Sequence, residues 1–284
     1  MDSLKKVLHV CQGSLKRTVF KPRLYIAFLW FGFLIFDFIE KIKVFSARVN
    51  VPVSPWIFPF ITTELSGQIF ITLGAILIFC DAPFLSEGVY SQIIRCGRKN
   101  WFWGNMLYIW MQSLFYAVGL FLFSVILLMP KVEFMTGWGK VLGTLAQTNA
   151  ASSVSLNQLE YSIISNFSPL QAVGLTLLAV WLNSVFIGVL SYVMNLLVKN
   201  GSGAVMGAII ALSPLLLTKL VQYEVSFYLA PPAWMNLAMY NWSGYGSYPS
   251  PRYMYTCLAF LIGVCTAVSY VGIRRKDLYI VKEL

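Results

Sequence analysis

Long stretches without any charged side chain constrain this chain more than any other feature. Residues 104–129 and 169–198 contain no Asp, Glu, Lys or Arg, and both are mostly apolar. A helix of about 20 such residues crosses the hydrocarbon layer of a membrane. Only 11% of the chain is charged, whereas a soluble domain carries about 25%. Because a soluble fold could not cover this much apolar surface, the sequence predicts an all-α integral membrane protein.

The apolar runs predict about six membrane spans. They cover residues 24–39, 56–80, 104–129, 169–198, 204–218 and 253–273. The start of the second span is the least distinct, because Glu64 interrupts it. A carboxylate that faces lipid is costly, so we expect Glu64 near the outer surface or against protein.

The predicted domain organisation is a single transmembrane domain over residues 1–284. Residues 24–129 hold spans one to three, residues 169–273 hold spans four to six, and residues 274–284 form a tail. Residues 1–23 precede the first span and contain an apolar stripe at helical spacing: Leu4, Val7, Leu8, Cys11, Leu15 and Val19. Such a stripe with lysines beside it is typical of an amphipathic helix in the membrane interface. The alternative is a flexible basic tail.

The distribution of Lys and Arg predicts the orientation in the membrane. With six spans, one side collects fourteen of these residues and the other side seven. Cytoplasmic loops carry the excess of Lys and Arg, so we expect a multi-pass protein of the cell membrane with both termini in the cytoplasm. The net charge of +10 then indicates contacts with anionic lipid, and no motif favours nucleic acid.

Few residues are available for catalysis or metal binding. His9 is the only histidine, and the five cysteines are irregularly spaced. An intramembrane enzyme needs paired acid–base groups or a metal site within the membrane. We therefore expect no catalytic residues, no metal site and no enzyme activity in this chain alone.

The segment from Ser86 to Trp101, between spans two and three, is the most informative part of the predicted cytoplasmic side. It reads as a short amphipathic helix that ends at Gly97 and is followed by basic residues. Glu87 near its start and Arg95 near its end both suit the helix dipole. The alternative interpretation is an interfacial connector whose basic residues only anchor it to lipid.

In this arrangement the chain resembles the permease subunits of type-2 ATP-binding cassette exporters. The resemblance rests on the order of the parts and on the Ile94-Arg95-Cys96-Gly97-Arg98-Lys99 stretch. It implies that the helix between spans two and three docks into a cytoplasmic ATPase subunit. That ATPase-coupling role would fall on Glu87, Tyr90, Arg95 and Arg98.

The resemblance also implies short re-entrant helices before the last span, where Pro231, Pro232 and Trp234 lie, and a second permease subunit in a homodimer or heterodimer. Small residues recur at four-residue spacing in the fifth span: Gly203, Gly207 and Ala211. Such spacing allows close helix packing in lipid. These three residues are candidates for the subunit interface, and packing within one subunit is the alternative.

No complete phosphate-binding loop is present, so ATP and Mg²⁺ are expected on a partner subunit rather than in this chain. The expected function is the permease subunit of an ATP-driven exporter of an amphipathic or apolar substrate, such as a peptide, lipid or drug. An ion-coupled secondary transporter and a non-transporting immunity or sensor subunit remain as alternatives.

Overall fold

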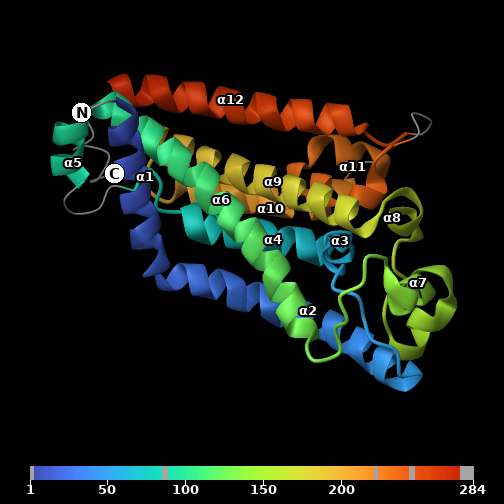
Figure 1. Cartoon of the computed structure of the whole chain (residues 1–284). Helices are drawn as coiled ribbons and strands as arrows, with labels where there is room; N and C mark the ends of the chain where they lie inside the picture. The colour runs from blue at the N-terminus through green and yellow to red at the C-terminus, as the bar shows by residue number, and fades with distance from the viewer. Residues whose placement is uncertain (1–2, 85–88, 221–222, 243–246, 276–284) are drawn as a thin grey trace.

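The computed structural model describes residues 3–84, 89–220, 223–242 and 247–275. Over these residues the chain is helical, and an isolated bridge between Val53 and Val132 is the one β-type pairing. Five of the described helices are long and apolar enough to cross a membrane: α2 (Pro22–Val49), α6 (Arg98–Leu128), α9 (Pro169–Leu197), α10 (Ser202–Leu220) and α12 (Pro251–Arg275). The chain is therefore a multi-pass membrane protein (Figure 1).

A sixth helix, α4 (Leu65–Phe79), runs alongside these five but is shorter. Its 15 residues extend about 22 Å, less than the roughly 30 Å of hydrocarbon. The short helix α3 (Phe58–Ile61) precedes it, and the chain breaks at Thr62, Thr63 and Glu64. The predicted second span is thus two helices, because Glu64 stands in an extended conformation at the N-terminus of α4.

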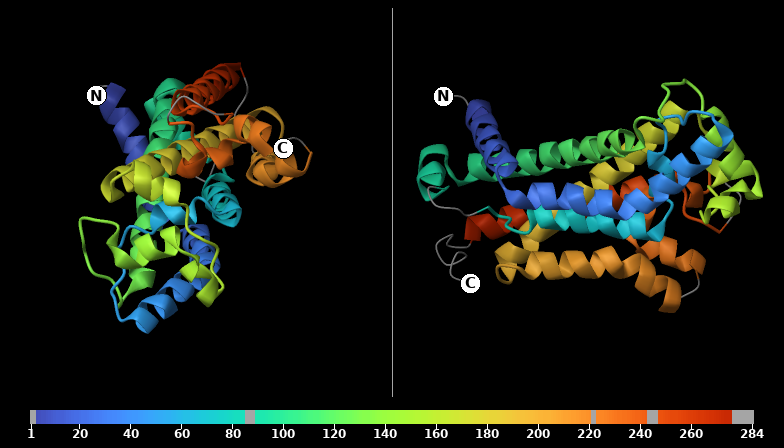
Figure 2. Two further views of the ribbon diagram at one scale, coloured as in Figure 1. Left: turned by 90° about the vertical axis from the view of Figure 1, so that its right-hand side faces the viewer. Right: turned by 90° about the horizontal axis from the view of Figure 1, so that it is seen from below.

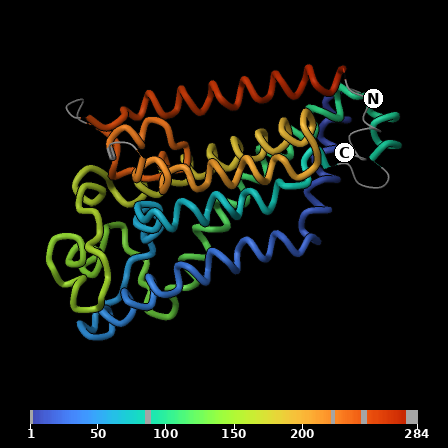
Figure 3. The backbone as a smooth tube through the Cα atoms, turned by 180° about the vertical axis from the view of Figure 1, so that it is seen from behind, coloured from blue at the N-terminus to red at the C-terminus, as the bar shows by residue number. Residues whose placement is uncertain are grey.

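The bundle has two ends of different character (Figures 1 and 3). One end holds α1 (Ser3–Val19), α5 (Val89–Cys96), the turn between α9 and α10, and the last turn of α12. Together with the starts of α2 and α6, these segments hold twelve described Lys and Arg residues, and Asp81, just after α4, is the one described acidic residue at this end. We call this the basic end and the opposite one the far end.

Helix α1 crosses the basic end at a steep angle to the spanning helices (Figure 2). It packs mainly on α6 through a face that consists of Val10, Cys11, Ser14 and Thr18. The apolar stripe predicted from the sequence does not form one buried face. Cys11 is on the buried face, whereas Leu4, Leu8 and Val19 are exposed, because α6 covers the neighbouring face of α1.

Helix α2 continues ten residues beyond the predicted end of the first span at Ile39. The charged residues after Ile39 do not end the helix, because Ile42 and Phe45 are buried on its inner face. Lys41 donates a hydrogen bond to Asp37 one turn earlier, with 2.6 Å between Nζ and Oδ2. Such i,i+4 ion pairs stabilise a helix that has left the hydrocarbon.

The far end carries a cap made of α7 (Gly139–Gln147), the 3₁₀ helix η1 (Asn149–Val154) and α8 (Tyr161–Asn166). These residues lie between the third and fourth predicted spans, in a segment without a long apolar run. Leu142, Leu145 and Ile163 nevertheless form a small buried core there. The Trp138 indole donates to the carbonyl of Phe167 at 2.9 Å and ties the two ends of the cap together.

Short helices occupy the segment between α10 and α12. They are α11 (Tyr223–Leu229) and the 3₁₀ helices η2 (Pro231–Met235) and η3 (Leu237–Met239). Trp234 is buried, and its indole donates to the carbonyl of Phe227 at 2.6 Å. The two prolines at the start of η2 lack backbone donors, which explains why α11 does not continue into η2.

Candidate functional site

Helix α5 has one buried face and one exposed face. Val89, Ile93 and Cys96 are buried, and α5 packs on α6 and α1. The opposite face consists of Ser91, Ile94 and Arg95, which are all exposed. Ile94 is 79% exposed, although helices at such connections usually turn their apolar residues inward. We call Ser91, Ile94, Arg95 and the following Arg98 the docking face.

Gly97 separates α5 from α6 by a sharp change of direction. Its φ of +81° lies in the region that glycine adopts without strain. Its amide donates to the carbonyl of Ile93, which ends α5, and its carbonyl accepts from Trp101 in the first turn of α6. The predicted helix end at Gly97 is confirmed, and α6 begins at Arg98, six residues before the predicted third span.

The four residues expected to couple the chain to an ATPase are placed unequally. Arg95 and Arg98 are exposed, on α5 and at the start of α6. Tyr90 is partly buried and packs against the core, so the docking face does not include its ring. Glu87 lies outside the described residues.

The small residues of α10 pack inside the chain. A Cβ atom added to Gly203 would lie 2.7 Å from the backbone of Ser191 in α9, and one added to Gly207 would lie 2.8 Å from Cγ1 of Ile76 in α4. Ala211 is fully buried. These residues therefore follow the intramolecular alternative and present no exposed surface to a second subunit. The exposed face of α10 consists of Val205, Ile209, Leu212 and Leu216.

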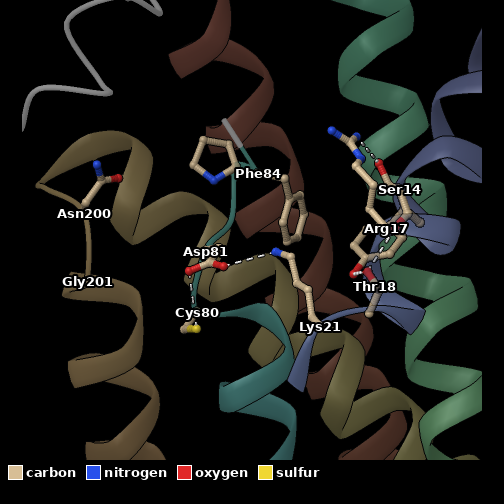
Figure 4. A pocket seen from close by; sticks show the side chains of 11 residues that line it. Ser14, Arg17, Thr18, Lys21, Cys80, Asp81, Phe84, Asn200 and Gly201 are labelled. Carbon is tan, nitrogen blue, oxygen red and sulfur yellow. Dashed lines mark hydrogen bonds and ion pairs between the residues drawn. The ribbon is translucent and has the colours of Figure 1, made fainter. Parts of the chain in front are cut away.

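The basic end also contains a pocket of about 530 Å³, which we call the elbow pocket. It lies between the α1–α2 elbow, the residues after α4, Tyr108 of α6, and the α9–α10 turn (Figure 4). In this view Lys21 reaches towards Asp81, with Arg17 on one side and Asn200 on the other. The basic residues of this end were predicted to mark the cytoplasmic side and to contact anionic lipid, and no pattern in the sequence placed them around a pocket.

Asp81 forms ion pairs with the basic residues next to the elbow pocket. Nζ of Lys21 lies 3.1 Å from its Oδ2, and Arg23 donates to its Oδ1. Burial acts to raise the pKa of the Asp81 carboxyl, but the hydrogen bonds from Arg23 and Lys21 outweigh it and hold the pKa below its usual 3.8. The carboxylate is therefore ionised at neutral pH and pairs with two cations of the α1–α2 elbow.

Asn195 of α9 links the segments next to the elbow pocket by hydrogen bonds. Its amide nitrogen donates to the carbonyls of Cys80 and Ala82 at 2.8 and 2.7 Å. Its carbonyl oxygen accepts from the amide of Gly203 at 2.7 Å. One side chain thus joins the end of α4 to the start of α10, a role that no pattern in the sequence indicated.

The far end has a smaller, polar cavity of about 230 Å³ at the base of the cap. Asp37, Lys41 and Glu64 line it, and Asn157 donates to Glu64 at 3.3 Å. Glu64 is therefore next to protein groups, as expected. Asp37 and Glu64 are the carboxylates within the predicted spans, and both lie at this end rather than in the middle of the bundle.

No cluster of three or more His, Cys, Asp or Glu side chains able to hold a metal ion occurs within the described part of the chain. The comparisons with known proteins add no assignment: neither a protein-family model nor a curated protein matches this sequence. The function is therefore inferred from the docking face, the charge distribution and the arrangement of the helices.

Proposed function

We propose that this chain is the permease subunit of an ATP-driven exporter. Its basic end faces the cytoplasm, and a separate ATPase subunit with bound ATP and Mg²⁺ binds the docking face of α5. ATP binding there favours one of two states of the bundle, and the cargo crosses as the states exchange. The resemblance to type-2 exporters and the helix order motivate this function, and the docking face is the observation that supports it most.

The docking face has the composition of a protein contact. Exposed Ile94 lies beside exposed Arg95 on the short helix α5, and exposed Arg98 follows at the start of α6. Arginine is enriched where interfaces derive most of their binding energy, next to apolar residues that exclude water. The pairing of Ile94 with Arg95 therefore suits docking on a protein, and the crosslinking experiment below separates docking from contact with lipid.

The difference in Lys and Arg between the two ends supports the orientation. The basic end has twelve described Lys and Arg residues, whereas the far end has seven. This is the asymmetry of a cytoplasmic face opposite an external face. In this orientation α1 lies in the inner interface with Leu4, Leu8 and Val19 towards lipid, and α11, η2 and η3 form the re-entrant segment on the outside.

A second permease subunit, identical or similar, would bind through exposed apolar faces rather than through the glycines of α10. The faces available on α2 and α10 include Leu29, Phe33, Val205 and Ile209, all at least 55% exposed. Each face would contact either lipid or the partner subunit. The cargo path between two such bundles would be apolar, which favours an amphipathic or apolar substrate.

Ion-coupled transport is less well supported. Such transporters place carboxylates and broken helices near the middle of the membrane. Here Asp37 is paired with Lys41 at the far end, and Glu64 accepts from Asn157. A sensor or immunity subunit would use the same bundle without an ATPase, and the following experiment separates it from a permease.

A photo-crosslinking residue at Ile94 of the full chain, in cells of its natural host, tests the proposal. Leu170, which is 67% exposed at the far end, is the matched control. We expect the Ile94 product to contain a cassette ATPase subunit, identified by mass spectrometry, and the Leu170 product to lack it. Products containing only lipid, or identical products at both positions, would contradict the proposal.

The arginines are tested by charge-conserving variants. Arg95→Lys with Arg98→Lys keeps the attraction to lipid headgroups but loses the planar, bidentate donor geometry. We expect the double variant to insert normally and to retain less ATPase in a pull-down. Full retention of the ATPase and of transport would mean that the arginines only anchor α5 to lipid.

A further inference from the structure

The elbow pocket lies where the charged end of the protein meets its apolar belt. Lys21 and Arg23 stand at the junction of α1 and α2. Val19 and Phe20 directly before them are 51% and 85% exposed, and Tyr25 and Ile26 directly after them are also exposed. In a bilayer this junction is at the level of the lipid headgroups, where basic pockets between spanning helices bind phosphate groups.

We propose that the elbow pocket binds the phosphate of an anionic lipid headgroup, with Arg17 and Lys21 as its ligands. The pocket volume of about 530 Å³ lies within the range of roughly 300–1,000 Å³ that ligand pockets occupy. This site is distinct from the docking face, and it does not depend on the assignment as a permease.

The charges around the pocket favour an anion. Arg17, Lys21 and Arg23 are positive, and Asp81 is the one acidic residue among the described residues around them. A bound phosphodiester would reduce the net positive charge of these four side chains. Lipid phosphates provide oxygen acceptors that suit the guanidinium of Arg17 and the ammonium of Lys21.

Lys21 keeps a donor for such an oxygen. An ammonium group has three N–H donors, and Asp81 accepts from Lys21 at 3.1 Å. The guanidinium of Arg17 already donates within α1, to the carbonyl of Gly13 at 3.2 Å and to Oγ of Ser14 at 3.3 Å, and would share its donors with a phosphate. Thr18 and the Tyr108 hydroxyl share a hydrogen bond of 2.6 Å on the pocket wall. Their contact fixes α1 against α6, so Arg17 and Lys21 are held beside the pocket before a ligand arrives.

Asp81 then acts as the competing anion. It holds Lys21 and Arg23 when the pocket is empty of phosphate, and a bound phosphate shares these cations with it. Removal of the carboxylate by Asp81→Asn should therefore strengthen phosphate binding. A purely structural ion pair gives the opposite result, because its loss loosens the elbow and weakens any site built on it.

Lipid binding by the full chain, purified in detergent and examined by native mass spectrometry, tests the proposal. Phosphatidylglycerol is compared with zwitterionic phosphatidylcholine. We expect Arg17→Gln with Lys21→Gln to weaken phosphatidylglycerol binding about a hundredfold, because each of the two charge-assisted hydrogen bonds to the phosphate contributes about tenfold. The control Lys5→Gln with Lys16→Gln removes the same charge from exposed positions of α1 that do not line the pocket.

The outcomes are distinct. Loss of phosphatidylglycerol in the pocket variant, little change in the control, and tighter binding in Asp81→Asn support the proposal. Equal effects in the pocket variant and the control would overturn it, as would weaker binding in Asp81→Asn. Inorganic phosphate is tested in lipid-free detergent by thermal unfolding. Protection that the pocket variant abolishes would assign the site to soluble phosphate and overturn the lipid assignment.

Discussion

Replacement of Asn195 by alanine should destabilise the bundle more than any other single amide substitution in α9. The variant loses the hydrogen bonds to the carbonyls of Cys80 and Ala82 and the bond from the amide of Gly203, all between 2.7 and 2.8 Å long. Each such bond contributes about 0.5–1.5 kcal/mol, and those between membrane helices average about 0.6 kcal/mol. The three together predict a loss of about 2–4 kcal/mol.

Asn183 of the same helix provides the matched control. It is equally buried, but it makes one bond, from its amide nitrogen to Oγ1 of Thr72 at 3.2 Å. Its side-chain oxygen has no hydrogen-bond partner in the described part of the chain. Asn183→Ala creates a cavity of the same size and removes an unsatisfied oxygen, so its cost should be below about 1 kcal/mol.

The free energy of unfolding in mixed micelles, measured for both variants and the wild type, checks this difference. Both variants delete the same side-chain group, so the difference between their free energies of unfolding reports the hydrogen bonds alone. If Asn195→Ala lowers the free energy of unfolding no more than Asn183→Ala does, then Asn195 does not join α4 to α10 in the way described.

Three further outcomes are expected. In a cysteine-free background, an impermeant reagent on intact cells should label a cysteine at Ser153 but not one at Ser91, and labelling at Ser91 contradicts the cytoplasmic placement of α5. Gly207→Ala should cost about 1–3 kcal/mol by its clash with Ile76, and Ile76→Ala should cost less in the Gly207→Ala background than in the wild type if the clash is real. The folded-state pKa of Asp81 is depressed, so its ion pairs should stabilise the folded chain above pH 4 and lose this effect as the pH falls through that pKa. Asp81→Asn should therefore be less stable than the wild type between pH 7 and 5, and a difference in stability that already disappears in this range would contradict the ion pairs.

The helices of the bundle could be predicted from the sequence because their signal is local. Uncharged apolar runs long enough to span a membrane became α6 and α9 almost directly. The helix ends could not be placed as well. Charged residues mark where hydrocarbon ends, not where a helix ends, so α2 continues past Ile39 and α6 starts before Gly104.

The candidate site was predicted only in part, for a similar reason. Gly97 and the arginines of α5 stand close together in the sequence. Helical periodicity also places Ile94 on the same face as Arg95, a signal that was available but not used. The contacts of Asp81 with residues near position 20 have no local signature. The spacing of Gly203 and Gly207 indicated close packing, but it did not reveal which helices they contact.

ATP hydrolysis by the purified assembly is the most direct test of the function. The wild-type chain is compared with Ile94→Glu, each reconstituted with the ATPase captured at α5. Loss of a contact in the centre of an interface typically costs about 2 kcal/mol or more, which raises the Kd at least about thirtyfold. We expect the wild-type assembly to hydrolyse ATP in a transport-dependent manner, the Ile94→Glu assembly to lose this activity, and the chain alone to have none. Hydrolysis by the chain alone, or an Ile94→Glu assembly as active as the wild type, would contradict the account.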